Sequence, residues 1–331
     1  MQTVFLGNYS NNEINLVTFD NQMNIESRYK TRIQRSNPSY MCINNEILYS
    51  VSEIHDKIAN SGYILAYKIT NNKLKFLNEM LSYGNDPCYV IFNELFNILF
   101  VANYTGGSFS AFEINEDGSI RKNIYKKHYG NESRVHQIQF SNDLKRVYIV
   151  DLGLNRIIEY EINCNNSDID LVEISNICFL NDEKPRHLVL DNSNNLYVIT
   201  EKSCEIYKIK HNKNKKLEIL EKISILPNGV EQKSNYTGCA IKIDDQKEYI
   251  YVSIRGHNSI SVFNIKNRLE LIQNIFCEGQ CPRDIGLSKD EKNLICANQL
   301  TDNISIFAIN NGILTFKNKY NIKTPTCICF K

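Results

Sequence analysis

The feature of this sequence that most constrains its fold is a segment that recurs seven times along the chain. Each copy consists of an apolar strand that ends in a few polar residues, a short turn and a second apolar strand. The copies span residues 4–19, 47–69, 98–114, 147–162, 196–209, 250–265 and 294–309. Their period of roughly 50 residues lies in the range of propeller blades. The repeat predicts one domain over residues 1–331, although length alone would suggest two.

Each repeat also contains a strand that begins at a proline or an equivalent chain breaker. These seven starts lie at residues 37–39, 86–88, 133–136, 184–187, 236–238, 281–283 and 324–326. A polar turn and the next strand follow each start, which is the pattern of a β-hairpin. Two further strands, such as residues 259–265 and 269–276, complete a four-stranded unit. The sequence therefore predicts an all-β fold, a seven-bladed β-propeller of four-stranded antiparallel blades.

The two ends of the chain carry complementary parts of one repeat. The N-terminus starts directly with a second-strand segment at residues 4–7, and the C-terminus ends with an unpaired first strand at residues 326–330. Each end lacks what the other supplies. We therefore expect the N- and C-terminal segments to pair in one blade and close the propeller.

Composition excludes several classes of partner. The chain has 38 Lys and Arg against 37 Asp and Glu, a net charge of +1, so no strong field attracts nucleic acid or an anionic membrane. No run of about 20 apolar residues suggests a membrane span. The N-terminus lacks the basic region of a signal peptide, so we expect a cytoplasmic protein. The close cysteine pairs, Cys277 with Cys281 and Cys327 with Cys329, lack the doublet spacing of a zinc site, and no metal is expected.

The polar residues of the repeats lie at strand ends that an antiparallel hairpin brings together. Residues equidistant from a turn face each other across the two strands. Counting from each turn places Arg186 opposite Glu201, His136 near Asp151, Arg283 near Asn298 and Gln299, and Arg255 opposite Thr237. Because the first strands line the channel of a propeller, we expect these residues to converge on one mouth of the channel.

The residue types at this mouth predict a site for a small anion. Three arginines, Arg186, Arg255 and Arg283, can bind a carboxylate or phosphate through their planar guanidinium groups. His136 can act as a general base, and a carboxylate such as Glu201 can orient a neighbouring group or act as an acid. Other polar residues expected around the substrate are His187, Asn103, Gln299, Asp151 and Glu53. The alternative is structural, since ion-pair networks in a wet channel give similar clusters.

Several segments, taken in their order and spacing, resemble the seven-bladed propeller lactonases over essentially the whole chain. This family includes the propeller type of 6-phosphogluconolactonase and the fungal carboxymuconate-cyclising enzymes. The matching segments include Asn37-Pro38-Ser39-Tyr40, Val101-Ala102-Asn103-Tyr104, Pro185-Arg186-His187, Arg255-Gly256-His257-Asn258 and Pro282-Arg283-Asp284. The resemblance implies a site without metal or cofactor, in which His136, Glu201, Arg186 and Arg255 take part in binding and proton transfer.

One segment departs from the family pattern. The family often has Pro-His-x-His before the third inner strand, whereas this chain has Ser133-Arg134-Val135-His136. The second histidine is kept and Arg134 replaces the first. Arg134 therefore adds positive charge to the expected mouth, which would change substrate preference or tighten phosphate binding.

The resemblance implies hydrolysis of a small anionic sugar lactone, with 6-phosphogluconolactone giving 6-phosphogluconate. His136 would remove a proton from the attacking water, and Arg186 or Arg255 would stabilise the oxyanion. Arg283 would hold the phosphate, and Glu201 would position Arg186 or protonate the ring oxygen. Two alternatives stay open: a carboxymuconate-type cycloisomerase, and a non-catalytic propeller that binds other proteins. We expect a monomer or a weak homodimer.

Overall fold

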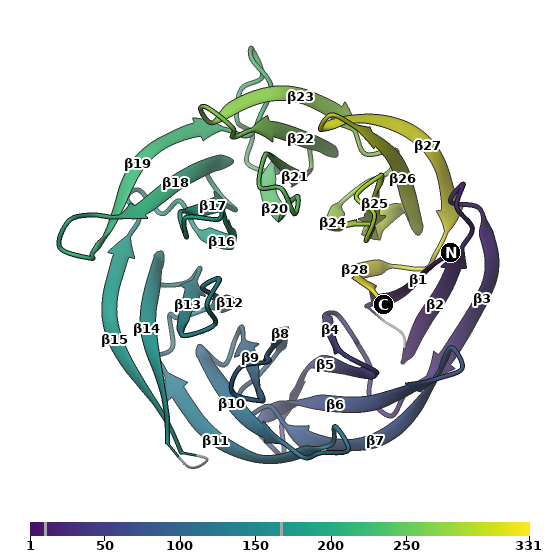
Figure 1. The fold of residues 1–331 in the computed structure, drawn as a ribbon, viewed down its shortest axis with the longest axis vertical. Helices are drawn as coiled ribbons and strands as arrows, with labels where there is room; N and C mark the ends of the chain where they lie inside the picture. Colours follow the sequence, from purple (N-terminus) through teal and green to yellow (C-terminus); the bar gives the residue numbers. More distant parts are fainter. Residues whose placement is uncertain (10–11, 166–167) are drawn as a thin grey trace. The chain divides into compact units, whose positions relative to one another are not determined.

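The chain forms seven antiparallel sheets of four strands each (Figure 1). The structure is a computed structural model that describes residues 1–9, 12–165 and 168–331. In these ranges the chain forms strands β1 to β28 and one short 3₁₀ helix, η1 (Gln299–Thr301). No helix within the described ranges is long and apolar enough to cross a membrane. The expected all-β fold with seven four-stranded blades is confirmed.

The described residues group into two compact units. The first consists of Met1–Leu6, Val17–Ser27 and Phe179–Lys331, and the second of Gly7–Leu16 and Arg28–Cys178. Each unit is described by itself below. The expectation of one domain over residues 1–331 stays a prediction.

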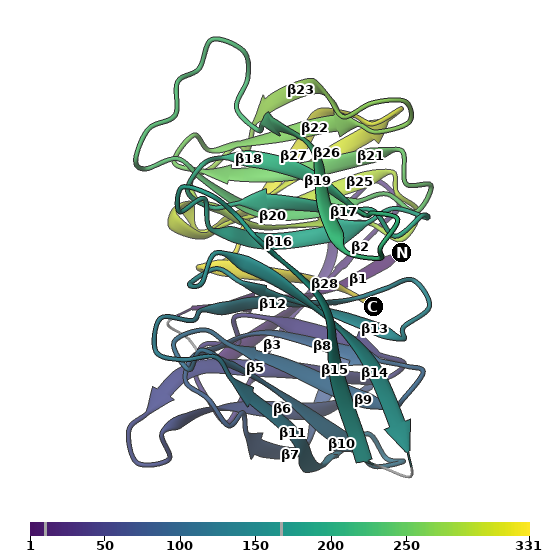
Figure 2. The ribbon, with the colours of Figure 1, turned by 90° about the vertical axis from the view of Figure 1, so that its left-hand side faces the viewer.

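Three complete sheets lie in the first unit, and the four strands of each are hydrogen-bonded in chain order, as in the sheet of β20 to β23 (Figure 2). Their first strands β16, β20 and β24 contact one another in sequence. The strands are β16 (Pro185–Leu190), β17 (Leu196–Thr200), β18 (Glu205–His211), β19 (Leu217–Ser224), β20 (Thr237–Ile243), β21 (Tyr249–Arg255), β22 (Ser259–Asn264), β23 (Glu270–Phe276), β24 (Pro282–Leu287), β25 (Asn293–Asn298), β26 (Asn303–Asn310) and β27 (Ile313–Asn321).

Three sheets lie in the second unit, and in each of them the four strands again pair in chain order. Their first strands also contact one another in sequence, β4 with β8 and β8 with β12. The strands are β4 (Met41–Asn44), β5 (Ile47–Asp56), β6 (Ser61–Thr70), β7 (Lys73–Leu81), β8 (Pro87–Asn93), β9 (Ile98–Asn103), β10 (Ser108–Ile114), β11 (Ile120–His128), β12 (Val135–Phe140), β13 (Arg146–Asp151), β14 (Arg156–Asn165) and β15 (Asp168–Cys178).

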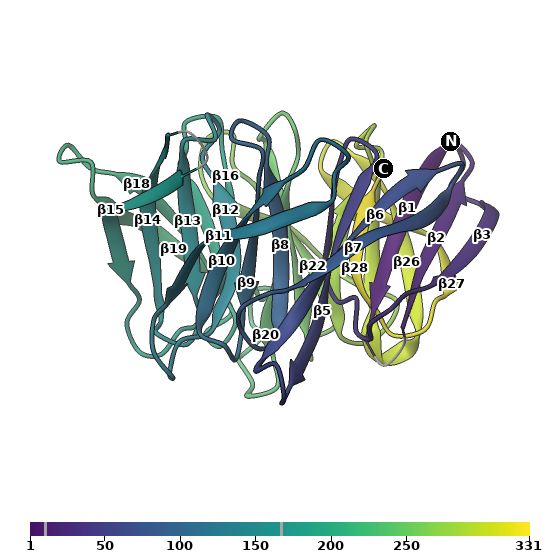
Figure 3. The same cartoon turned by 90° about the horizontal axis from the view of Figure 1, so that it is seen from below.

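The seventh sheet joins the two ends of the chain, as the sequence predicts. Its strands follow the order β28 (Pro325–Phe330), β1 (Gln2–Asn8), β2 (Glu13–Phe19) and β3 (Ile25–Arg32). The C-terminal strand thus lies beside the N-terminal strand (Figure 3). Beyond β28, the Lys331 amide donates a hydrogen bond to the Thr3 carbonyl at 2.9 Å.

Apolar side chains from neighbouring sheets form the core of each unit. In the first unit Ile199 and Ile206 pack with Val252 and Phe263, and all four are fully buried. These residues belong to strands of two consecutive sheets, β16–β19 and β20–β23. Side chains on alternate faces of a strand can therefore fill the space between sheets on both sides. This packing leaves the strand ends as the place where polar side chains can lie.

Four first strands carry a β-bulge directly after their first residue pair, and β20 carries one after its second pair. In β16, for example, Pro185 pairs with Thr200 and His187 pairs with Ile199, so one residue between them has no partner across the ladder. A bulge re-aims the side chain of the unpaired residue. The residues skipped in this way are Cys88 in β8, His136 in β12, Arg186 in β16, Cys239 with Ala240 in β20, and Arg283 in β24.

Candidate functional site

One carboxylate oxygen of the first unit contacts two arginines. Glu201 Oε2 lies 3.1 Å from Arg186 Nε and 2.8 Å from Arg255 Nη2. Arg186 is the bulge residue of β16, Glu201 directly follows β17, and Arg255 ends β21. The expected pairing of Arg186 with Glu201 is therefore observed. The contact with Arg255 joins a second sheet to the pair.

Further contacts fix the guanidinium group of Arg186, which is only 3% exposed. Its Nη1 donates a hydrogen bond to the carbonyl oxygen of Cys239. The same Nη1 lies 3.4 Å from each ring nitrogen of His187, the next residue and itself buried. His187 therefore lies beside Arg186, and its contact with a substrate stays a prediction. A buried charge held in this way is restricted to one orientation.

Arg255 is held by its opposite residue, as counting from the turn predicts. Thr237 pairs with Arg255 in the ladder, and Arg255 Nε donates to Thr237 Oγ1 at 3.0 Å. Neighbouring Cys239 and Glu201 raise the pKa of Arg255, against the effect of burial. The guanidinium therefore stays charged at any physiological pH. It can attract an anionic ligand without a change of protonation.

A hollow of about 570 Å³ opens beside Glu201 and Arg255. Gly256 adopts a φ of 78°, and a Cβ atom there would collide with the carbonyl oxygen of Asn235. Only glycine allows the two backbone segments to approach so closely. The hollow is lined by Glu201, Asn235, Thr237, Arg255, Gly256, Asn258, Gln280, Cys281 and Leu300.

Arg283 and Gln299 lie at the start and end of the neighbouring hairpin. Pro282 pairs with Asn298, so Arg283 and Gln299 flank this pair, as expected. Arg283 is half-buried in the bulge of β24. The backbone N–H of Gln299 donates a hydrogen bond to the Cys281 carbonyl oxygen at 3.0 Å. Burial raises the pKa of the Cys281 thiol, and neighbouring Cys239 raises it further, whereas nearby arginines lower it.

His136 lies in the second unit, at the bulge of β12, and is 8% exposed. Its imidazole packs edge-to-face against the ring of Tyr104, with the ring centroids 5.6 Å apart and the planes at 82°. The thiol of Cys88 lies 3.6 Å from the His136 carbonyl oxygen. These contacts hold both the ring and the backbone of the expected general base.

Asp151 and Arg134 fix the segment that precedes His136. Asp151 Oδ1 accepts the backbone N–H of Arg134 at 2.9 Å, and its Oδ2 accepts the Ser133 hydroxyl at 2.8 Å. Arg134 Nη1 donates to the carbonyl oxygens of Asn131 and Ser133 at 2.6 and 2.5 Å. Asp151 is fully buried and Arg134 is half-buried. Their contact with a substrate stays a prediction.

Asn103 is also engaged within the protein. Its Nδ2 donates to the Ser82 carbonyl at 3.2 Å and to Ser108 Oγ at 3.3 Å. Asn298 in the first unit makes the same pair of bonds, to the Cys277 carbonyl at 3.0 Å and Ser305 Oγ at 3.1 Å. The recurrence indicates that this asparagine joins the strands of its blade. It could be recognised in sequence as an asparagine five or seven residues before a serine.

Glu53 has a backbone role that the structure makes explicit. Its N–H donates to the Asn37 carbonyl at 3.0 Å, and Asn37 Nδ2 donates to the Glu53 carbonyl at 3.1 Å. The Glu53 side chain is half-exposed. Its participation in substrate binding stays a prediction.

The candidate residues are divided between the two units. Arg186, Glu201, Arg255 and Arg283 form one arginine cluster with His187 and Gln299 in the first unit, whereas His136, Asp151, Arg134, Asn103 and Glu53 belong to the second. Joint action of the two groups on one substrate stays a prediction. No group of three or more His, Cys, Asp or Glu in the described ranges could hold a metal ion.

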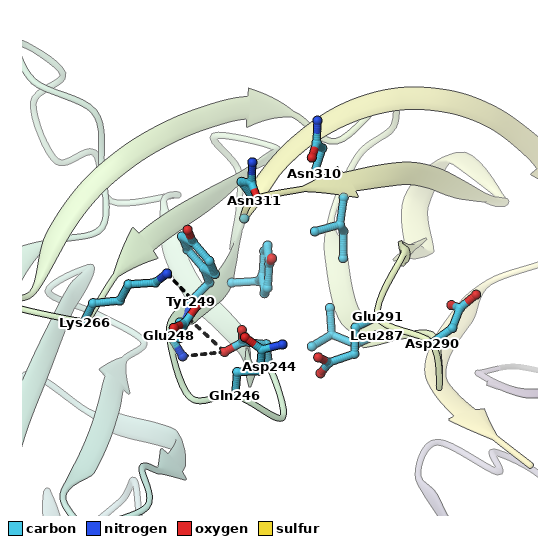
Figure 4. Close-up of a pocket in the computed structure, with 13 residues that line it drawn as sticks. Asp244, Gln246, Glu248, Tyr249, Lys266, Leu287, Asp290, Glu291, Asn310 and Asn311 are labelled. Atoms are coloured by element: carbon cyan, nitrogen blue, oxygen red, sulfur yellow. Dashed lines mark hydrogen bonds and ion pairs between the residues drawn. The ribbon is translucent and has the colours of Figure 1, made fainter.

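A second cavity of the first unit, of about 290 Å³, has the opposite charge (Figure 4). It lies at the turns that join β20 to β21 and β24 to β25. Four carboxylates line it, from Asp244, Glu248, Asp290 and Glu291. Among these carboxylates, Glu248 forms an ion pair with Lys266 at 2.7 Å. An anionic substrate would be repelled here, so the arginine cluster is the better candidate site for an anion.

Sequence reasoning missed the part played by Cys239, Cys281 and Tyr104. Cys239 and Cys281 both carry free thiols, and Cys239 is buried whereas Cys281 is partly buried. Their contacts with the arginines arise between neighbouring sheets, and counting along one hairpin cannot give them. The role of Cys239 could have been found from its position in the repeat. Cys239 directly follows the chain breaker of its repeat, as Arg186 and Arg283 do in theirs.

Comparison with known proteins connects this geometry to one family. The family model described as "Lactonase, 7-bladed beta-propeller" matches residues 3–330. A Bacillus subtilis (strain 168) protein named 6-phosphogluconolactonase is 28% identical over an alignment 331 positions long, which covers 94% of this chain and 92% of that protein. A crystal structure from Lactobacillus plantarum is 25% identical, with a TM-score of 0.88 over 100% of both chains. A periplasmic gluconolactonase from Pseudomonas aeruginosa shares the fold, with a TM-score of 0.88 at 21% identity over 99% and 98% of the chains.

Proposed function

We propose, from the premise that this chain belongs to the seven-bladed β-propeller lactonase family, that it hydrolyses 6-phosphogluconolactone to 6-phosphogluconate. The observation that carries the proposal is the carboxylate of Glu201 between Arg186 and Arg255, beside a hollow that can admit a small ligand. The relative named 6-phosphogluconolactonase supports the phosphorylated substrate.

Arg255 stabilises the oxyanion that forms when water attacks the lactone carbonyl. Arg255 lines the hollow, and its Nε and Nη2 are already bound to Thr237 and Glu201. Among the hydrogen bonds of the described residues, none starts from Arg255 Nη1. This N–H group is therefore available to the substrate. A fixed donor aimed at a developing negative charge is among the largest contributions to catalysis of acyl transfer.

His136 acts as the general base, the role that the family resemblance implies. It takes a proton from water as the water oxygen bonds to the lactone carbonyl carbon. When the tetrahedral intermediate collapses, the bond from this carbon to the ring oxygen breaks. The protonated His136 returns its proton to that oxygen, so the histidine is regenerated. The product is a single open-chain sugar acid that carries both the new carboxyl group and the released hydroxyl group.

Glu201 positions the arginines in this scheme. Its Oε2 contacts two guanidinium groups, at 3.1 Å from Arg186 Nε and 2.8 Å from Arg255 Nη2. Of the two roles considered for Glu201, orientation of Arg186 and Arg255 is therefore the one we propose.

Arg186 and Arg283 bind the phosphate of the substrate, and no cofactor takes part. Both are bulge residues of first strands, Arg186 of β16 and Arg283 of β24, and these two strands each contact β20. His187 and Gln299 of the same cluster, and Arg134, Asn103, Asp151 and Glu53 of the second unit, are further candidates for substrate contact. The free cysteines of the described residues support the cytoplasm as the compartment. A monomer or weak homodimer stays our expectation.

The proposal is tested by lactonase assays on the purified chain and on His136→Ala, with the uncatalysed hydrolysis subtracted. We expect saturable turnover of 6-phosphogluconolactone, lowered about 10²–10⁴-fold in the variant if His136 is the general base. The matched control is His128→Ala, an exposed histidine at the end of β11. Near-normal activity of His136→Ala would remove this residue from the mechanism.

The choice of substrate separates the proposal from its alternatives. Unphosphorylated gluconolactone tests the role of the phosphate, and a carboxymuconate lactone tests a cycloisomerase, which consumes no water. Absence of turnover with all three substrates would overturn the proposed function and favour a binding protein.

A further inference from the structure

Cys239 occupies in β20 the position that Arg186 and Arg283 occupy in the neighbouring strands β16 and β24. Each of these residues lies in the bulge that follows the chain breaker. Every side chain at this position carries a hydrogen on oxygen, nitrogen or sulfur. The residues, in chain order, are Ser39, Cys88, His136, Arg186, Cys239, Arg283 and Thr326.

Hydrogen bonds through Cys239 connect the two arginines. Arg186 Nη1 donates to the Cys239 carbonyl oxygen. The Cys239 thiol in turn donates to the Arg283 carbonyl oxygen, with 3.1 Å between sulfur and oxygen. Cys239 is fully buried, so water cannot replace its thiol as the donor to this carbonyl. One residue thus contacts both arginines that we assign to the phosphate.

A thiol makes the same type of contact in the second unit. Cys88 Sγ lies 3.6 Å from the carbonyl oxygens of both Val135 and His136. Cys88 and His136 are the bulge residues of β8 and β12. In each unit, therefore, a bulge cysteine contacts the backbone of the bulge residue in the next sheet. The contact of Cys239 is the shorter of the two.

We propose that Cys239 is a positioning residue, which holds the guanidinium of Arg186 and the backbone of Arg283 at the spacing that binds the anionic group of the substrate. The inference rests on the proposed function for the identity of the substrate. Cys239 does not touch the substrate itself. It acts through the two arginines, so its loss weakens substrate binding more than the chemical step.

Two substitutions of Cys239 separate the hydrogen bond from the space that the side chain fills. Cys239→Ala removes the donor, and we expect KM for 6-phosphogluconolactone to rise about three- to tenfold, the size of one lost hydrogen bond. We expect kcat to change by less than about twofold, since Arg255 and His136 are untouched. Cys239→Ser keeps a donor at the same position and should restore most of the affinity.

Cys296→Ala is the matched control. Cys296 is also fully buried, lies in β25, and its thiol contacts Asn298 Oδ1 at 3.4 Å instead of a bulge residue. This variant loses the same sulfur atom from the core and should keep the wild-type KM. A fall in melting temperature common to both alanine variants is then attributed to packing.

A binding measurement makes the test independent of turnover. Inorganic phosphate that binds the arginines should raise the melting temperature of the wild type, because it binds only the folded chain. We expect a smaller rise for Cys239→Ala and a wild-type rise for Cys239→Ser and Cys296→Ala. If the wild type lacks lactonase activity but shows this pattern with phosphate, the proposed function fails and the role of Cys239 stands.

Three results would overturn the role of Cys239 while leaving the proposed function intact. One is an active wild type with the same KM and phosphate response in Cys239→Ala. Another is a serine variant that behaves like the alanine variant. The third is an equal rise of KM in Cys296→Ala, which would assign the effect to general loss of packing.

Discussion

At the scale of single residues, the most consequential arrangement is Glu201 between two guanidinium groups. Counting from the turn between β16 and β17 predicts that Arg186 faces Glu201, and this contact is observed at 3.1 Å. The same counting cannot give the 2.8 Å contact of Glu201 with Arg255. Arg255 belongs to the next sheet, and distances between sheets depend on how their apolar faces pack. Contacts within a hairpin were therefore predictable, and contacts between hairpins were not.

Glu201→Gln should separate orientation from charge. Loss of the carboxylate frees both arginines, so we expect kcat/KM for the lactone to fall about tenfold or more. The same change removes a negative charge beside the anion site, so inorganic phosphate should inhibit the variant at several-fold lower concentration. Inhibition curves with inorganic phosphate, measured beside kcat/KM, check whether phosphate binding strengthens while catalysis weakens. Glu205→Gln, which disrupts a 3.0 Å ion pair with Lys222, is the control, and equal effects of both substitutions would contradict the argument.

At the scale of elements, the residue pairing of the first strands could be predicted from the sequence. The bulges in these strands could not, because the repeat does not reveal them. The prolines and turns place Pro185 against Thr200 and Pro282 against Asn298, as the hairpin pattern requires. The unpaired Arg186 and Arg283 then interrupt the two-residue alternation of side chains between the two faces of the strand. A bulge adds one residue to one strand only, which hydrophobic periodicity over so short a strand cannot detect.

The strand β24 also carries a buried carboxyl group whose titration can be measured. Asp284 is 3% exposed, its Oδ2 accepts the Ile328 N–H at 2.9 Å, and Lys242 Nζ lies 4.0 Å away. Burial raises the pKa of Asp284 above its value in the unfolded chain. The stability associated with the protonated carboxyl is therefore present at low pH and is lost as pH rises through the folded-state pKa.

Asp284→Asn cannot ionise and should escape this loss. We expect the variant to melt about 2–4 °C above the wild type at neutral pH, with the difference vanishing in acid, for a change of about 1 kcal/mol. Melting curves across the pH range check the trend. Asp117→Asn is the control, because it removes an exposed carboxyl whose pKa is lowered by hydrogen bonds from Ser119. Its melting temperature should not rise above that of the wild type as pH increases. If Asp284→Asn instead melts below the wild type at neutral pH, the ion pair with Lys242 outweighs the cost of burying the charged Asp284 carboxylate, which would contradict this prediction.

At the scale of the whole molecule, the strand order of all seven sheets follows from the sevenfold repeat, including the sheet made from both ends of the chain. The prediction succeeded because every repeat contains a first strand followed by three more. The C-terminus holds a first strand without its partners, and the N-terminus holds the partners without a first strand. Removing residues 325–331 should therefore expose an edge of β1 and remove the buried Cys327 and Ile328. We expect the melting temperature to fall by about 10 °C or more, since several kcal/mol of burial are lost.

The control for this truncation removes only Lys331, whose backbone bond to Thr3 lies beyond β28. Calorimetry or circular dichroism of both truncated chains measures the difference. An unchanged melting curve after removal of residues 325–331 would contradict the structural role of the terminal strand.

The pairing of β28 with β1 also sets the timing of assembly during synthesis. The ribosome makes β1 (Gln2–Asn8) long before its neighbour β28 (Pro325–Phe330). At translation rates of about 5–20 residues per second, β1 waits roughly 15–65 seconds before its partner emerges. Throughout that interval one edge of the nascent N-terminal strand is open to wrong neighbours. The strands that are made first are thus the ones that complete their sheet last.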